Sequence, residues 1–292
     1  MKILVTGGAG FIGTNLIRRL VEEGHDVVSV DNYFTGTKAN HIKGAKYIDQ
    51  DIRDLNNDSF GFWGVKSKPD IIFHLAAMAR IFPSFKQPKE YYTTNTNGTL
   101  NLVDFCSKNN IPIVYAGSSS KHSGRFKNPY TFSKDVGEDI ITLYQEHYNL
   151  KASIVRFYNV YGPNQLQEGG YCTVIGIWLR ALREKKPLII FGDGEQRRDF
   201  THVRDIVDAL IKIGDQNAWG HEFELGRGVN HSLNEIVQHL NETPNYRPAR
   251  PGEAKITLNT DITANKVLGW NPQINLLEYL TEEHPYGIKY FL

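Results

Sequence analysis

The chain has 292 residues, of which 40% are hydrophobic, so it is long enough for two domains with substantial cores. Its 33 Lys and Arg residues against 32 Asp and Glu residues give a net charge of +1, which excludes a strong overall attraction to nucleic acid or to an anionic membrane. Two cysteines are too few for a disulfide framework, and no apolar run approaches the roughly 20 residues of a membrane-spanning helix. Because its first residues carry no signal-peptide pattern, the sequence predicts a cytoplasmic protein.

Short apolar runs alternate with helical segments over the first 115 residues, which predicts a parallel sheet with helices on both faces. Buried strands are expected at residues 3–5, 27–30, 71–73 and 113–115. A helix is expected from Phe11 to Glu23, because its apolar residues recur on one face and Gly24 follows. Two further long helices are expected at residues 91–108 and 130–148.

A glycine-rich loop follows the first expected strand, with the sequence Gly7-Gly8-Ala9-Gly10-Phe11-Ile12-Gly13. Glycines at these positions allow a tight turn and let the amides at the start of a helix approach a pyrophosphate. Asp31 ends the second strand about 20 residues after Gly10, where a carboxylate accepts hydrogen bonds from ribose hydroxyls and repels a 2′-phosphate. This order of elements predicts a Rossmann-type, doubly wound α/β fold that binds NAD in preference to NADP.

A second pattern, Tyr130-Thr131-Phe132-Ser133-Lys134, places a phenol and an ammonium four residues apart on one helix face. The positive charge favours the ionised phenol, which can then act as a base near neutral pH. The serines Ser118, Ser119 and Ser120 follow the strand at residues 113–115, at the sheet edge where open α/β sheets bind ligands. A hydroxyl there could hold a reacting oxygen while Tyr130 moves its proton, so Tyr130, Lys134 and one serine are predicted to be catalytic.

With further matches along nearly the whole chain, these motifs resemble the extended short-chain dehydrogenase/reductase family, in particular its nucleotide-sugar epimerases and dehydratases. The further matches lie at residues 31–32, 51–54, 74–77, 95–99, 156–163, 191–194, 198–205, 250–253 and 268–272. The resemblance implies an NAD-binding domain at residues 1–158 and a smaller mixed α/β domain for a nucleotide sugar at residues 159–292. Part of the second domain, near residues 187–203, is expected to return to the main sheet. A homodimer is the expected assembly.

The resemblance also implies roles for individual residues. The residues assigned to NAD are Gly7, Gly10, Phe11, Ile12, Gly13, Asp31, Asn32, Asp51, Ile52, Leu75, Ala76, Ala77, Asn95, Tyr130 and Lys134. Asp51 and Ile52 would meet the adenine, and Asn95 would line the path toward the nicotinamide. Asn159 and Phe191 would contact the nucleotide sugar. Arg198 and Arg250 would bind its diphosphate, because a guanidinium can hold two phosphate oxygens at once. No metal is required for this chemistry.

The segment between the serines and Tyr130 is shorter than is usual in the family. Counting forward from the strand therefore selects Ser118 as the catalytic serine, which we prefer, and counting back from Gly124 selects Ser119. The segment also carries a basic cluster of Lys121, His122, Arg125 and Lys127. This cluster is interpreted as a solvated loop or, alternatively, as a contact for an acidic group on the substrate.

The reaction type is inferred from one further departure. Family dehydratases commonly carry an Asp-Glu pair after the catalytic hydroxyl, where this chain has serine and lysine, so a 4,6-dehydratase is disfavoured. The sequence therefore predicts an NAD-dependent nucleotide-sugar 4-epimerase, with UDP as the favoured nucleotide. The alternatives are another nucleotide-sugar enzyme of the family (a decarboxylase, a dehydratase or a 4-ketoreductase) and, from a different class, a non-catalytic NAD-binding regulator.

Overall fold

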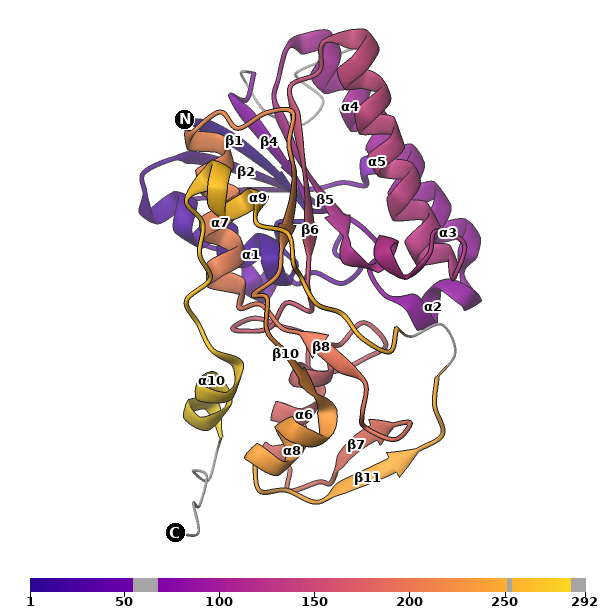
Figure 1. Ribbon diagram of the computed structural model, residues 1–292. Coiled ribbons are helices and arrows are strands. Elements are labelled where there is room, and N and C mark those ends of the chain that lie inside the picture. Colours follow the sequence, from indigo (N-terminus) through magenta and orange to yellow (C-terminus); the bar gives the residue numbers. More distant parts are fainter. Residues whose placement is uncertain (55–67, 251–253, 285–292) are drawn as a thin grey trace.

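The computed structural model describes residues 1–54, 68–250 and 254–284. In this part of the chain a seven-stranded parallel sheet has the strand order β3-β2-β1-β4-β5-β6-β9 (Figure 1). Its strands are β1 (Lys2–Thr6), β2 (Asp26–Asp31), β3 (Lys46–Asp49), β4 (Ile71–His74), β5 (Ile113–Ser118), β6 (Ala152–Phe157) and β9 (Glu222–Leu225). Because the order runs outward in both directions from β1 and β4, the predicted doubly wound, Rossmann-type fold is confirmed.

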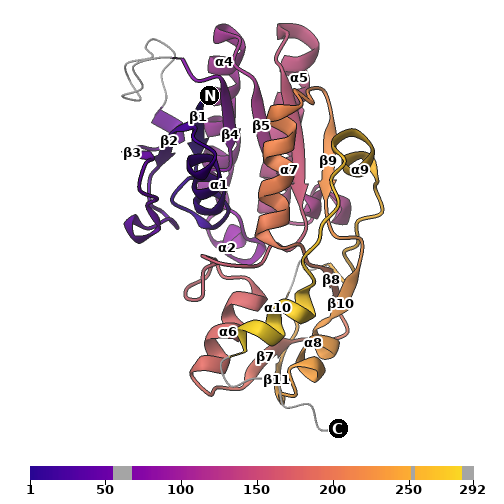
Figure 2. The ribbon, with the colours of Figure 1, turned by 90° about the vertical axis from the view of Figure 1, so that its left-hand side faces the viewer.

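Helices cover both faces of this sheet (Figures 1 and 2). One face carries α1 (Phe11–Glu22), α7 (Val203–Asp215) and α9 (Thr263–Leu268), and the other carries α4 (Thr99–Asn109) and α5 (Pro129–Tyr148). Successive side chains of a strand point to opposite faces, so Val5 of β1 packs in the first core and Leu4 in the second. Strands that are buried on both faces explain the continuous apolar runs in the sequence.

Two of the expected helices differ in detail from the structure. The segment expected as one helix at residues 91–108 consists of α3 (Pro88–Tyr92), a π-helical stretch (Thr93–Gly98) and α4. Helix α5 begins at Pro129, because Pro suits the first helical position and the Asn128 side chain accepts a hydrogen bond from the Thr131 amide at 2.8 Å. This start places Tyr130 in the first turn of the helix.

A smaller region lies beyond the carboxyl ends of the main strands, at the bottom of Figure 1. It contains α6 (Val174–Arg183), β7 (Leu188–Phe191), β8 (Arg197–Asp199), β10 (Asn230–Ser232), α8 (Leu233–His239), β11 (Pro244–Arg247) and α10 (Leu276–Glu283). Strand β7 pairs with β11 and β8 pairs with β10, in two small sheets. A separate core that includes Trp178, Leu188 and Ile236 holds this region together.

The expected return of residues 187–203 to the main sheet is wrong. These residues form β7 and β8 of the small sheets, and the return is made later, by α7 and β9. Strand β7 pairs with β11 and packs Leu188 and Ile190 into the core of the smaller region, whereas Phe223 and Leu225 of β9 are buried beside β6. Figure 2 shows α7 lying alongside α1 on the sheet. Segments after residue 158 thus complete the larger region as well as forming the smaller one.

Among the helices of the described segments, none is both long and apolar enough to cross a bilayer.

Candidate active site

A cavity of about 730 Å³ opens at the carboxyl ends of the main strands and continues into the smaller region. Most of the residues that the sequence assigns to the site line it. They are Gly7, Gly10, Phe11, Ile12, Gly13, Asp31, Asn32, Ile52, Leu75, Ala76, Ala77, Ser118, Ser119, Tyr130, Lys134, Asn159, Phe191, Arg198 and Arg250. One continuous space therefore joins the glycine-rich loop, the tyrosine and the two arginines.

The glycine-rich loop forms one wall of the cavity at the start of α1. Gly7 has a φ of +73°, which favours glycine, and a Cβ on Gly13 would lie 2.2 Å from the Gly7 carbonyl oxygen. A Cβ on Gly10 would meet only that same oxygen, at 3.2 Å, and Gly10 itself borders the cavity. The loop thus packs tightly against the helix while it leaves the amides at the start of α1 accessible to a phosphate group.

Asp31 closes β2 at the edge of the cavity. Its carboxylate accepts hydrogen bonds from the backbone amides of Ala9 at 2.9 Å and Tyr33 at 2.8 Å. Burial raises the pKa of Asp31, and these two amides oppose that shift. A carboxylate oxygen accepts more than one hydrogen bond, so Asp31 can also receive ribose hydroxyls. The loop and Asp31 together fit a dinucleotide.

Two residues assigned to NAD do not line the cavity. Asp51 accepts a hydrogen bond from Asn32 at 2.8 Å and forms an ion pair with Arg53 at 2.9 Å. Asn95 is fully buried in the π-helical stretch, where its side chain bonds the backbone N–H and C=O of Met78 at 2.8 and 3.0 Å. Because these polar atoms bond the protein, Asp51 and Asn95 help to position Asn32 and the Met78 segment, and the roles of Asp51 at the adenine and of Asn95 near the nicotinamide stay predictions.

The Tyr130 hydroxyl donates a hydrogen bond to Ser118 Oγ at 3.1 Å. Ser118 ends β5 and also bonds the Ser120 hydroxyl, at 2.9 Å. The Ser119 hydroxyl instead donates to the backbone carbonyl of Phe157 at 2.8 Å. Of the two candidate serines, Ser118 is therefore the one that contacts the tyrosine.

Lys134 follows Tyr130 by one turn of α5 and is buried, with Nζ 4.2 Å from the centre of the Tyr115 ring. Burial lowers the pKa of Lys134 to about 7, against the opposing effect of Glu138. Burial also raises the pKa of Tyr130, although the hydrogen bond with Ser118 and the charge of Arg80 act to lower it. Because its pKa is raised, the phenol is neutral in the free protein near pH 7, and the Ser118 hydrogen bond and the Arg80 charge favour its ionisation.

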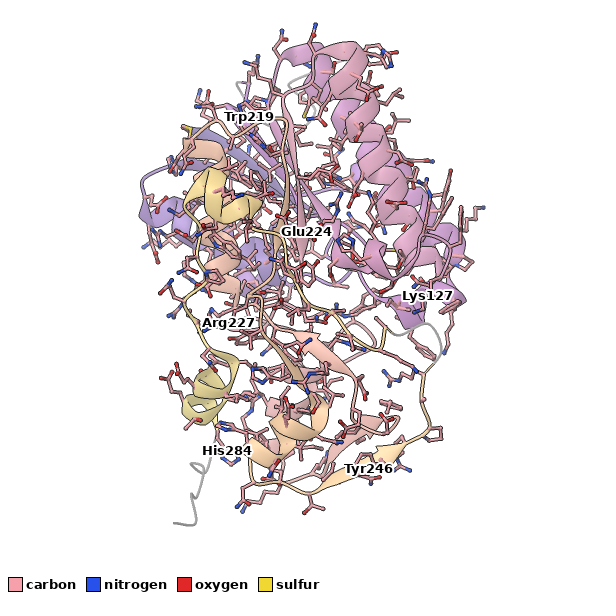
Figure 3. All side chains as sticks on the ribbon, in the orientation of Figure 1. Lys127, Trp219, Glu224, Arg227, Tyr246 and His284 are labelled. Atoms are coloured by element: carbon pink, nitrogen blue, oxygen red, sulfur yellow. The ribbon has the colours of Figure 1, made fainter. Side chains whose placement is uncertain are left out.

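The interpretation of the basic cluster as a substrate contact is wrong for Lys121, His122 and Arg125. Lys121 pairs with Glu138 at 2.8 Å, and Arg125 pairs with the carboxylates of Asp135 and Asp139 on α5. His122 pairs with Glu224 of β9 at 2.9 Å, and Figure 3 shows Glu224 near the centre of the molecule. The charges of Lys121 and Arg125 are thus neutralised by carboxylates of α5, and these contacts, together with that of His122, fix the serine loop to α5 and β9.

The part of the cavity in the smaller region is bordered by the four residues expected to bind the substrate. The Arg250 guanidinium lies 3.4 Å from the centre of the Phe191 ring, a stacking contact. Arg198 lies on β8, and its Nη1 donates to the Lys255 carbonyl at 3.2 Å. The Asn159 amide donates to the Asp199 carbonyl at 2.8 Å. Residues 251–253, which complete the motif that begins at Arg250, lie outside the described residues.

Sequence reasoning missed many residues of the cavity wall, among them Arg80, Tyr171 and Cys172. Arg80 follows β4 by six positions and precedes α2 (Ile81–Lys86), and its Nε donates to the Tyr171 carbonyl at 2.7 Å. A single charge in the mostly apolar stretch after the His74-Leu75-Ala76-Ala77 motif is the signal that could have indicated it.

Within the described ranges, no cluster of three His, Cys, Asp or Glu side chains could hold a metal ion. A doubly wound sheet with a glycine-rich loop, a terminal acid on β2 and a serine, tyrosine and lysine at the strand ends defines a dinucleotide-binding enzyme of the short-chain dehydrogenase type.

Comparison with known proteins identifies the family within this class of dinucleotide-binding enzymes. The NAD-dependent epimerase/dehydratase family matches residues 3–226. UDP-glucose 4-epimerase of Mycolicibacterium smegmatis is 32% identical over 95% of this chain and 96% of its own length. UDP-N-acetyl-α-D-glucosaminuronate decarboxylase of Bacillus cytotoxicus is 29% identical over 82% of this chain and 79% of its own.

Solved structures agree with these relatives. UDP-glucose 4-epimerase of Thermotoga maritima, solved with UDP-glucose, superposes with a TM-score of 0.89 at 29% identity over 98% of each chain. UDP-glucuronic acid 4-epimerase of Bacillus cereus, solved with UDP-glucuronic acid and NAD, superposes with a TM-score of 0.87 at 27% identity over 98% of each chain. The chain belongs to the NAD-dependent epimerase/dehydratase family, and it is an enzyme whose cofactor is NAD.

Proposed function

We propose that this enzyme interconverts the C4 epimers of a nucleotide sugar, with UDP as the favoured nucleotide. The observation that carries the proposal is the hydrogen bond of Tyr130 to Ser118, in a cavity that continues to Arg198 and Arg250. Epimerases of UDP-sugars among the relatives support the same reaction.

In this proposal the chain's own residues transfer the proton and bind the substrate. Tyr130 would take the proton of the sugar 4-hydroxyl while Ser118 hydrogen-bonds the same oxygen. The Lys134 ammonium would stabilise the ionised phenol, one helical turn away. Arg198 and Arg250 would neutralise the diphosphate at the other end of the substrate.

Gly10, Gly13 and Asp31 would hold NAD, which would supply the hydride-transfer chemistry at C4 of the sugar, an oxidation followed by a reduction with no net redox change. Between oxidation and reduction the sugar would be a 4-ketone, and it would have to rotate within the cavity so that the hydride returns to its opposite face. The two arginines would hold the diphosphate during this rotation, so the intermediate stays bound.

The geometry argues against one alternative reaction, the elimination of water, but does not distinguish an epimerase from a decarboxylase. Among the described residues, the carboxylates that line the cavity are Asp31 and Glu90, and Glu90 pairs with Arg53 at 2.8 Å. An acid and a base for the elimination of water are therefore missing beside Tyr130 in the described structure, which disfavours a 4,6-dehydratase. A decarboxylase would begin with the same oxidation at C4, so product identification has to separate it from an epimerase.

The test is turnover of UDP-glucose and UDP-glucuronate, with products identified by NMR. Tyr130→Phe should lower kcat by roughly 1000-fold while bound NAD is retained, because only the proton-transferring hydroxyl is removed. Tyr246→Phe, at an exposed position of β11 outside the cavity, is the matched control and should be as active as the original chain.

Residual activity of Tyr130→Phe within tenfold of the unaltered enzyme would overturn the assignment of Tyr130. Loss of the sugar carboxyl group as carbon dioxide would identify a decarboxylase. Absence of any turnover with both sugars, in a protein that binds NAD and UDP, would favour the non-catalytic regulator.

We further propose a cytoplasmic homodimer. Support for a dimer comes from Leu100 of α4 and from Leu143 and Tyr148 of α5, which are large apolar side chains exposed on the two long helices. Such side chains are what a helical interface would cover.

A further inference from the structure

Arg80 is a cation at the reacting end of the cavity that the mechanism above does not use. It precedes α2, lines the cavity and is fixed by one hydrogen bond, from its Nε to the backbone carbonyl of Tyr171 at 2.7 Å. This bond uses one of the five N–H groups of the guanidinium. A neutral carbonyl therefore holds the Arg80 guanidinium in place, and its remaining N–H groups can donate to a further group.

No carboxylate of the described segments forms an ion pair with Arg80. Its ionisable neighbours are the phenols of Tyr130 and Tyr91 and the thiol of Cys172. Burial raises the pKa of all three, so they are uncharged near pH 7. The buried Arg156 shows the contrast, because it forms ion pairs with Glu138, Glu222 and Glu224.

A guanidinium that is shielded from water usually has an anion beside it, since removing an unpaired charge from water is costly. Burial indeed lowers the pKa of Arg80. Arg80 is half-buried, and because the walls around it provide only neutral groups, an anion that pairs with it would come from the cavity itself. In the proposed function Arg198 and Arg250 bind the diphosphate in the smaller region, whereas Arg80 lies near enough to Tyr130 for its charge to lower the pKa of the phenol, at the end where the sugar ring would lie.

We propose that Arg80 binds a carboxylate on the sugar ring, so that the preferred substrate is a nucleotide-linked uronic acid. The inference rests on the proposed function, which places the 4-hydroxyl at Tyr130. In a hexuronic acid the carboxyl group is attached to C5, the neighbour of C4, so a cation beside Tyr130 is within reach of it. A planar guanidinium binds both carboxylate oxygens, whereas a neutral hexose offers one hydroxyl at this position.

Two other roles of Arg80 predict different substrate dependence. If Arg80 served only to ease the ionisation of Tyr130, its removal would lower kcat equally for neutral and acidic sugars without changing their binding. If it bound the diphosphate, its removal would weaken UDP itself. Only carboxylate recognition makes the effect selective for the uronic acid.

The test measures binding separately from catalysis. In a Tyr130→Phe background, dissociation constants for UDP-glucuronate, UDP-glucose and UDP are obtained by calorimetry with and without Arg80→Met. We expect Arg80→Met to weaken UDP-glucuronate on the order of 50-fold, because a charge-assisted hydrogen bond is lost, and to change UDP-glucose and UDP less than threefold. Arg80→Lys, which keeps the charge but not the fork, should recover part of the loss.

Two controls separate an effect on ligand binding from an effect on folding. Arg19→Met removes an exposed arginine of α1 and should leave all three constants unchanged, and thermal unfolding monitors the Arg80 variants. Equal weakening of all three ligands, or no selective loss of UDP-glucuronate, overturns the proposal. An enzyme that epimerises UDP-glucose without preferring the uronic acid keeps the proposed function and refutes this inference. If the enzyme binds UDP-glucuronate selectively but turns over neither sugar, the inference about Arg80 is kept and the proposed function is refuted.

Discussion

The two ends of the cavity are built in different ways. At the cofactor end, Gly7, Gly10, Gly13 and Asp31 come from one β-α-β unit at the start of the chain. At the sugar end, the wall is assembled from segments that are far apart in sequence, around Ser118, Tyr171, Arg198 and Arg250. The first end depends on local backbone geometry and the second on contacts between distant elements. Substitutions at the two ends should therefore fail in different ways.

The largest effect is expected at the cofactor end, from Gly13→Ala. The new methyl carbon would lie 2.2 Å from the Gly7 carbonyl oxygen and 2.6 Å from Gly8 Cα, and backbone atoms cannot move aside as a side chain can. Displacement of α1 should cost about 3 kcal/mol of unfolding free energy. Thermal unfolding should show a Tm lower by roughly 5 °C for a chain of this size.

Gly10→Ala is the matched comparison in the same loop. Its methyl group would meet only the Gly7 carbonyl oxygen, at 3.2 Å, but it would border the cavity. We expect a nearly unchanged Tm together with weaker binding of NAD, measured by fluorescence titration. If Gly13→Ala unfolded at the temperature of the unaltered chain, the tight packing of loop against helix would be refuted.

A smaller loss of stability is expected from Glu138→Gln, which tests the contacts that join distant elements. Glu138 is buried on α5 and binds both Arg156 of β6, at 2.7 Å, and Lys121, at 2.8 Å. Removing its charge leaves the two cations without this partner, which should lower the free energy of unfolding by roughly 2–3 kcal/mol. Urea denaturation measures the change.

Asp139→Asn, at the next position of the helix, is the control for Glu138→Gln. Asp139 is 53% exposed and pairs with Arg125, so its loss should cost less than about 1 kcal/mol. Equal losses for the two variants would contradict the view that the buried network, rather than helix charge in general, fixes the serine loop to the sheet.

The difference between local geometry and contacts of distant elements also explains which parts of the fold the sequence predicts. Strands β1, β2, β4 and β5 and helices α1 and α5 are predicted because apolar periodicity, glycines and helix caps act over a few residues. Strand β9 is missed because Phe223 is identifiable as a sheet residue only once it packs beside β6.

The site residues show the same difference between local motifs and long-range contacts. The glycine-rich loop, Asp31, Tyr130 and Lys134 belong to local motifs with fixed spacing. The position of Asn95 depends on hydrogen bonds to the backbone of Met78, 17 residues away, and that of Arg80 on the carbonyl of Tyr171, 91 residues away. Contacts of this length have no signature in one sequence, so the hydrogen bonds of Asn95 to Met78 and of Arg80 to Tyr171 cannot be predicted from it.

The smallest effect is expected where a local motif sets the choice of cofactor. The Asp31 carboxylate would receive ribose hydroxyls and repel a 2′-phosphate, so Asp31→Ser should weaken NAD about tenfold and leave NADP nearly unchanged. Asp26→Ser, at the exposed first residue of the same strand, is the control and should preserve the ratio of the two affinities. Because burial raises the pKa of Asp31, acidification protonates its carboxylate earlier than that of an exposed aspartate, and the preference for NAD should narrow as the pH falls. A ratio of NAD to NADP affinity that is the same in Asp31→Ser as in the unaltered enzyme would show that the loop alone, and not the carboxylate at the end of β2, selects the cofactor.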